Sequence, residues 1–136
     1  MKRIGFLAVL AMCCMGCAKT GDSVPNVGVN FEASLSDPRL AALKTTGGAV
    51  VIDGYGVAGL IIYHSVYGYV AYDRCSSYMP QNKCAVTLDN PTLTATDPCS
   101  GSKFSLTDGT PVKAPATRSL KPYAVNTNTF EIFVSN

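Results

Sequence analysis

Tryptophan is absent from this sequence of 136 residues, only one histidine occurs, and charged residues make up 15% of the chain. The single histidine, His64, cannot supply both imidazoles of a two-histidine metal site within one chain. Lys2 and Arg3 lie in a segment that we expect to be cleaved. Without these two of the 11 basic residues, the chain has nine basic and nine acidic residues. Because phosphate contacts need clustered lysine and arginine, this near-neutral body argues against nucleic-acid binding.

The rest of the composition favours a compact all-β domain. Hydrophobic residues make up 47% of the chain, and its 12 glycines and 8 prolines are spread along it, as in proteins of many short strands joined by turns. Asp37 and Pro38 predict one short helical turn over residues 37–44, and Asp108-Gly109 predicts a hairpin turn. Apolar runs predict strands over residues 27–35, 49–53, 57–64, 67–72, 84–88, 92–96, 104–106, 121–125 and 129–134. We therefore predict one small sandwich or barrel of about eight to ten short strands with minimal helix.

The N-terminal segment predicts export and lipid attachment. Two basic residues precede an apolar stretch over residues 4–15, which is too short to span a bilayer and indicates a secretory signal. Gly16-Cys17 follows, and a small residue before cysteine resembles the bacterial lipobox, in which the cysteine is acylated and the signal is cleaved before it. Cys13 and Cys14 are alternatives with less suitable preceding residues, and an ordinary signal peptide is another. We predict a signal peptide over residues 1–16.

A lipidated Cys17 would determine where the protein resides. Two or more acyl chains hold a protein stably on a membrane, and the polar residues that follow form a tether, so that residues 17–27 are predicted to be anchor and tether. Ala18 stands after Cys17 where an aspartate would favour retention in the inner membrane, and sorting in other Gram-negative bacteria then favours the outer membrane. The expected partners are the membrane and an envelope protein.

Motifs between residues 69 and 125 are more specific than the strand pattern. Cys75 closes the sequence Ala-Tyr-Asp-Arg-Cys, and Asp97 opens Asp-Pro-Cys-Ser-Gly-Ser-Lys-Phe. This arrangement resembles the Rieske family, whose members carry a Cys-x-His loop, a second loop Cys-Pro-x-His-Gly-Ser-x-Phe and then Gly-Pro-Ala-x-x-x-Leu-x-x-Tyr. The residues at matching offsets are Gly101, Ser102, Phe104, Asp108, Gly109, Pro115, Ala116, Leu120 and Tyr123. The resemblance covers residues 46–136, extends to the small Rieske-like lipoproteins of the Bacteroidetes, and implies a Rieske-like β domain over residues 28–136.

The positions that bind the 2Fe-2S cluster in this family depart from its pattern. Cys75 stands at the first cysteine position and Ser77 at the first histidine, while Asp97 stands at the second cysteine position and Ser100 at the second histidine. A Rieske cluster needs two thiolates and two imidazoles, so that one ligand in four is retained. Serine hydroxyls stay protonated near neutral pH and are poor iron ligands. We therefore expect no cofactor and no bound metal.

The same resemblance implies a disulfide. Cys99 falls where several Rieske proteins carry a bridge between the two loops, and Cys84 in or just after the first loop is its expected partner. The rival pairing is Cys75–Cys99. With Cys84–Cys99 paired, Cys75 is left over and is expected to pack as a small apolar group. A zinc site built from Cys75, Cys84, Cys99 and Asp97 is a less favoured alternative, because no Cys-x-x-Cys pair is present and export favours disulfides.

Other candidate residues carry ordinary interpretations. His64 follows an apolar strand without a neighbouring acid, and Ser100 lacks the Gly-x-Ser-x-Gly elbow of a hydrolase, so that no enzyme activity is expected. Tyr78 in the first loop is the tyrosine best placed to contact a partner. The expected function is that of an exported lipoprotein whose Rieske-fold domain has lost its ligands and acts as a binding or structural module at the cell envelope. The alternative is an electron-transfer protein with a non-standard iron–sulfur centre.

Overall fold

The computed structural model describes residues 23–136. The predicted signal peptide, Cys13, Cys14 and the lipidation site Cys17 therefore lie outside the described residues. Over residues 23–136 the chain forms ten strands and two short 3-10 helices, η1 (Pro38–Lys44) and η2 (Pro80–Asn82). In this part of the chain, no helix has the length and apolar character needed to cross a bilayer. The all-β prediction with minimal helix is confirmed.

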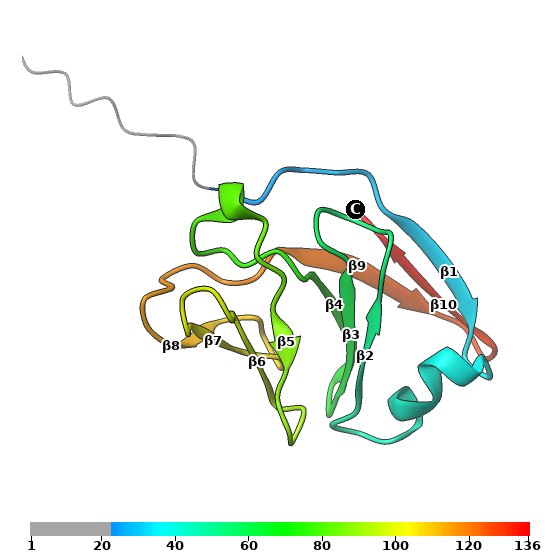
Figure 1. Ribbon diagram of the computed structural model, residues 1–136. Coiled ribbons are helices and arrows are strands. Elements are labelled where there is room, and N and C mark those ends of the chain that lie inside the picture. Colours follow the sequence, from blue (N-terminus) through cyan, green and yellow to red (C-terminus); the bar gives the residue numbers. More distant parts are fainter. Residues whose placement is uncertain (1–22) are drawn as a thin grey trace, which may run out of the picture.

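A six-stranded antiparallel sheet forms the framework, with the strand order β1-β10-β9-β4-β3-β2 (Figure 1). The outer pair β1 and β10 is matched along its length, from Asn30 opposite Ser135 to Ser34 opposite Glu131. Strands β4 and β9 join only at two residue pairs, Ala71 with Tyr123 and Tyr72 with Pro122. The strands are β1 (Asn30–Ser34), β2 (Ala49–Ile52), β3 (Leu60–Ser65), β4 (Gly68–Asp73), β9 (Pro122–Thr127) and β10 (Glu131–Ser135).

A smaller four-stranded antiparallel sheet is formed by the chain between β4 and β9. Its strands are β5 (Thr87–Leu88), β6 (Thr94–Thr96), β7 (Lys103–Ser105) and β8 (Pro111–Lys113), in that order across the sheet. Figure 1 shows this sheet on one side of β2, β3 and β4, with η1, β1 and β10 on the other side. The predicted Asp108-Gly109 turn connects β7 to β8, as a hairpin.

Strand β3 lies between two hydrophobic cores. Leu60 and Ile62 belong to the core that includes Phe31, while Ile61 and Tyr63 belong to the core that includes Phe104. Because successive strand residues point to opposite faces, a strand covered on both faces must be apolar at every position. This explains why residues 60–63 form a continuous apolar run.

Several boundaries differ from the prediction, for local reasons. Strand β3 begins at Leu60 rather than at residue 57, because Gly56 and Gly59 adopt positive φ angles of 63° and 100° and form a turn. The helical turn is confirmed, with the Asp37 carboxylate accepting from the Arg39 amide at 2.8 Å. Strand β8 and helix η2 were not predicted, since each has only three residues and begins with proline.

Candidate functional site

Three connecting segments meet at the end of the molecule that carries η2 (Figure 1). The first loop runs from β4 to β5 over residues 74–86, the second from β6 to β7 over residues 97–102, and the third from β8 to β9 over residues 114–121. A single bridge between Cys75 and Ala85 narrows the first loop near its base. The four positions that correspond to Rieske ligands lie in the first two of these loops.

A disulfide between Cys84 and Cys99 joins the first loop to the second, with the two Cα atoms 6.4 Å apart. This is the pairing that the family resemblance implied, and the rival Cys75–Cys99 pairing is wrong. Cys84 is buried, whereas Cys99 is exposed to solvent. Cys75 is the free cysteine of the described residues.

Asp97, at the second cysteine position, is the centre of a hydrogen-bond network. Its carboxylate is buried, with 1% of the residue exposed. Oδ1 accepts from the amides of Cys99 at 2.8 Å and Ser100 at 3.3 Å, and Oδ2 accepts from the hydroxyls of Ser76 at 2.7 Å and Ser100 at 2.6 Å. Burial alone would raise the pKa of Asp97, but the hydroxyls of Ser100 and Ser76 and the two amides outweigh it and hold the pKa below its usual value.

This network extends into the third loop and connects all three segments. The hydroxyls of Ser100 and Ser102 lie 2.9 Å apart, and Ser102 Oγ accepts from the amide of Ala116 at 2.9 Å. Ser76 and Ser102 are completely buried, so that both hydroxyls depend on these partners. Sequence reasoning missed Ser76, and it identified Ser102 as a motif residue without this role. Two of the four positions matched to Rieske ligands in the sequence, Asp97 and Ser100, belong to this network.

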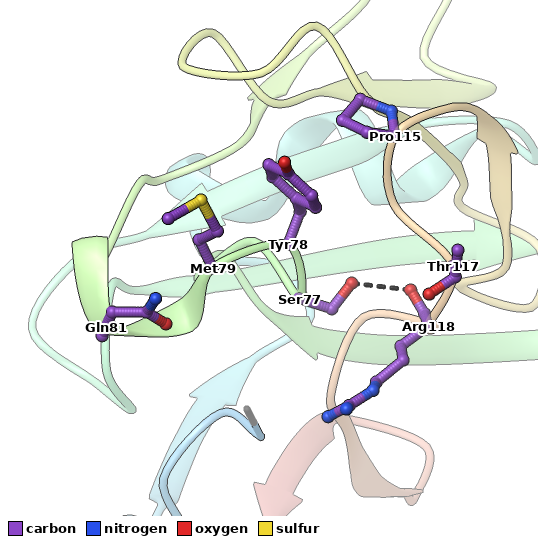
Figure 2. A pocket seen from close by; sticks show the side chains of 7 residues that line it. All are labelled: Ser77, Tyr78, Met79, Gln81, Pro115, Thr117 and Arg118. Atoms are coloured by element: carbon purple, nitrogen blue, oxygen red, sulfur yellow. Dashed lines mark hydrogen bonds between the residues drawn. The ribbon is translucent and has the colours of Figure 1, made fainter. Parts of the chain in front are cut away.

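The side chains at the two remaining positions of the first loop are also engaged by the protein. Ser77 donates its hydroxyl to the carbonyl of Arg118 at 2.6 Å (Figure 2). Cys75 is completely buried, and its Sγ lies 3.6 Å from the carbonyl of Pro80. Burial, helped by the charge of Asp73, raises the pKa of the Cys75 thiol to about 11, so that it stays protonated near neutral pH.

The carboxylate of Asp73 holds the base of the first loop. It accepts from the amides of Val57 at 2.6 Å, Ala58 at 3.1 Å and Cys75 at 2.8 Å, and from the hydroxyl of Tyr123 at 2.8 Å. Burial, followed by this hydrogen bond to Asp73, raises the pKa of Tyr123 well above its ordinary value. The motif residue Tyr123 thus positions the loop through Asp73.

These donors do not fit a Rieske cluster. The four positions supply one buried, protonated thiol, two hydroxyls and one carboxylate. The oxygens of this carboxylate already accept hydrogen bonds from the hydroxyls of Ser76 and Ser100 and from a backbone amide, while the hydroxyl of Ser77 donates to the Arg118 carbonyl. A Rieske cluster takes two thiolates and two imidazoles. His64 lies on β3, where its ring stacks on Tyr69 with centroids 4.4 Å apart and its Nδ1 lies 2.8 Å from the Leu43 carbonyl. It is therefore already engaged away from the loops.

Part of the alternative zinc set is brought together. The potential ligand atoms of Cys84, Asp97 and Cys99 all lie within 4.8 Å of one another. Cys75 lies outside this group of described residues, which corrects the four-residue set considered from the sequence. In the oxidised protein the sulfurs of Cys84 and Cys99 are bonded to each other.

A pocket of about 380 Å³ opens between the first and third loops. In Figure 2 the ring of Tyr78 stands between Met79 and Pro115, with Gln81 beyond Met79 and with Thr117 beside Arg118. A second, more apolar hollow of about 270 Å³ shares Ser77 and Arg118 with it. The pocket is lined by Ser77, Tyr78, Met79, Gln81, Pro115, Thr117 and Arg118.

Comparison with known proteins identifies the fold. No protein-family model and no curated protein matches the sequence. The plasma membrane Rieske protein PetC3 from Synechocystis PCC 6803 matches with a TM-score of 0.55 and 22% identity, over 82% of this chain and 100% of that chain. A chain from the complex of reduced oxygenase and oxidized ferredoxin in carbazole 1,9a-dioxygenase matches with a TM-score of 0.50 and 22% identity, over 79% and 99%. The described part of the chain therefore has a Rieske-like all-β fold.

Proposed function

We propose that this chain is an exported lipoprotein, anchored through Cys17, whose Rieske-like domain has lost the ligands of the 2Fe-2S cluster. It acts as a binding or structural module at the cell envelope, on the periplasmic or outer face of the outer membrane, as expected for a relative of the Rieske-like lipoproteins of the Bacteroidetes. The observation that carries the proposal is the network around Asp97. The hydrogen bond from Ser76 to Asp97 joins the two loops that a cluster would otherwise cross-link, and the hydrogen bond from Ser100 holds the same carboxylate within its own loop.

The loops then serve as a fixed protein surface. The disulfide and the serine network restrain the first and second loops, and a pocket of about 380 Å³ opens beside Tyr78 on that surface. Met79 is 45% exposed beside it, which suits contact with a partner. Ser100 donates to Asp97 rather than to an imidazole, and this argues against a nucleophilic role.

The proposed anchor would place this surface close to the membrane. Ser23 and Val24, the first described residues, line the apolar hollow together with Ser77 and Arg118. A fully extended chain from Cys17 to Ser23 spans at most about 20 Å. A lipid on Cys17 therefore keeps the loop end of the domain within roughly that distance of the bilayer surface, so that an envelope protein is the partner to expect.

Iron content tests the loss of the cluster. The purified chain is treated anaerobically with iron and sulfide, in parallel with an authentic Rieske protein, and is then analysed for iron and visible absorption. A colourless chain without stoichiometric iron supports the proposal. Two irons per chain with visible bands would instead favour the electron-transfer alternative. A matched variant carrying Ser77→His, Asp97→Cys and Ser100→His, which restores the family's ligand types, should gain iron if ligand loss is the cause.

Membrane attachment tests the lipid anchor. The wild-type chain is expected in the membrane fraction of a Gram-negative host, with a mass that includes acyl groups. Cys17→Ser should release it, whereas Cys14→Ser should leave it attached. Attachment that persists in Cys17→Ser would contradict anchoring through this residue.

A further inference from the structure

The disulfide and the buried carboxylate beside it form a group that the proposed function does not use. Cys84, Asp97 and Cys99 place their potential ligand atoms within 4.8 Å of one another, on two different loops. Two sulfurs and one carboxylate oxygen are ligands that zinc(II) accepts, with a fourth position left for water. We propose that reduction of the Cys84–Cys99 disulfide converts this group into a zinc(II) site formed by Cys84, Cys99 and Asp97.

The reduction step is accessible and chemically balanced. Cys99 is exposed, so that a dithiol reductant can attack its sulfur. The S–S bond breaks, the two cysteines gain two electrons and two protons, and the reductant is oxidised to its own disulfide. Zinc then displaces one proton from each thiol as it binds.

The distances suit a tetrahedral ion. Two thiolates on one zinc lie about 3.7 Å apart, since each Zn–S bond is about 2.3 Å long. Sulfurs that are no longer bonded move apart to about this separation by van der Waals repulsion alone. The Cα atoms of Cys84 and Cys99, 6.4 Å apart, can stay in place while the side chains make this adjustment.

A carboxylate oxygen of Asp97 lies within 4.8 Å of both sulfurs, and the carboxylate is held by hydrogen bonds. The amides of Cys99 and Ser100 hold Oδ1, and this contact does not depend on the disulfide. Oδ2 accepts from the hydroxyls of Ser76 and Ser100. Ser100 is only half-buried, so that its hydroxyl can turn to water and release a lone pair to the metal. The remaining bonds then fix the carboxylate as outer hydrogen bonds fix other metal ligands.

Cys75 provides a matched control. It is completely buried, its Sγ faces the carbonyl of Pro80, and it lies outside the ligand group. A nonspecific reaction of zinc with any free thiol would involve Cys75, whereas the proposed site would not. The Cys75→Ser variant therefore distinguishes the proposed site from nonspecific binding of zinc to a free thiol.

Zinc titration of the full chain tests the site. Cys13, Cys14 and Cys17 are first replaced by serine, so that only the body cysteines remain. Zn²⁺ is titrated against a coloured chelator before and after reduction by a phosphine, which is oxidised to the phosphine oxide with oxygen from water. We expect one zinc per reduced chain and none per oxidised chain. Cys84→Ser and Asp97→Asn should lower the affinity at least about tenfold, and Cys75→Ser should leave it unchanged.

Replacing zinc with Co²⁺ gives a second measurement that does not depend on the Asp97 variant folding. Thiolate-to-cobalt absorption should appear on reduction of the parent chain, and its intensity should fall by about half in Cys84→Ser, since one of two thiolates is lost. Equal zinc binding by oxidised and reduced chains, full binding by Cys84→Ser, or loss of binding in Cys75→Ser would overturn the proposal. Unfolding of the reduced parent chain in circular dichroism would also overturn it, because the three ligands are neighbours only in the folded protein.

Discussion

Replacing Asp97 with asparagine removes one charge while keeping the size of the side chain, and so tests the network that joins the three loops. The asparagine oxygen can still accept from the amides of Cys99 and Ser100. Its amino group then faces the hydroxyls of Ser76 and Ser100, which must turn and accept. Hydrogen bonds to charged groups contribute about 1.5–3 kcal/mol and neutral ones about 0.5–1.5. Of the two serines that donate to Asp97, only Ser76 is fully buried, and we therefore expect a loss of about 2 kcal/mol in the free energy of unfolding at neutral pH.

The pH dependence of that loss identifies its cause. The folded-state pKa of Asp97 lies below the unfolded value of about 3.9, so that the charge stabilises the fold above that pH and ceases to do so as the pH falls through the folded pKa. Urea unfolding of the wild type and Asp97→Asn should therefore differ at neutral pH and converge in acid, as the pH falls through the folded-state pKa of Asp97. Equal stabilities at neutral pH, or a difference that is the same at neutral pH and in acid, would refute the reasoning.

Three further substitutions test other contacts. Tyr123→Phe removes the hydroxyl that donates to Asp73 at 2.8 Å, and urea unfolding should show a loss of about 1–2 kcal/mol in the free energy of unfolding. Tyr67→Phe, at a residue that is 91% exposed, is the control. An equal loss in that control would exclude a special role for the hydrogen bond to Asp73. Cys84→Ser opens a bridge with a sequence separation of 15 and should cost about 3 kcal/mol in unfolding without reductant. That difference should largely vanish when both proteins are reduced, and its full persistence would locate the cost in packing instead. Gly56→Ala places a Cβ against the Asp73 carboxylate at a φ of +63° and should lower the free energy of unfolding by more than about 2 kcal/mol. Its control is Gly47→Ala, with a φ of +90° and nothing within 4 Å, which should show the smaller backbone cost alone. Similar losses of stability for the two variants in thermal unfolding would argue against crowding at Asp73.

Periodicity and turn chemistry account for the parts of the fold that the sequence predicted. The continuous apolar run that becomes β3 is a property of the sequence itself, because both faces of this strand are buried. Asp37 and Pro38 act locally, as do Asp108 and Gly109, so that the helical turn and the β7–β8 hairpin could be predicted without tertiary information. The Cys84–Cys99 pairing came from the family resemblance and not from spacing.

The site residues were only partly predictable, because their roles depend on distant contacts. Asp97 was identified as a departure from the family's ligand pattern, but its partner Ser76 lies 21 positions earlier in the chain. Ser102 was noted as a motif residue, and its hydrogen bond to the Ala116 amide spans 14 positions. Serine is common in loops for many reasons. Only the folded arrangement of three loops distinguishes these two serines from the others.

The two-pair contact between β4 and β9 separates the chain into a framework and an excursion. The chain leaves the large sheet after Asp73 and returns at Lys121, where the Asp73 amide donates to the Lys121 carbonyl at 2.9 Å. The exit and the return are thus neighbours in one ladder, and between them the excursion packs against the large sheet through the core that Ile61 and Tyr63 share with Phe104. We expect insertions or exchanges confined to the surface loops of this excursion to leave the register of the framework strands unchanged. The loops at the end of the molecule that carries the pocket are therefore the part open to redesign, whereas the small sheet has to stay because it covers one face of β3 and β4.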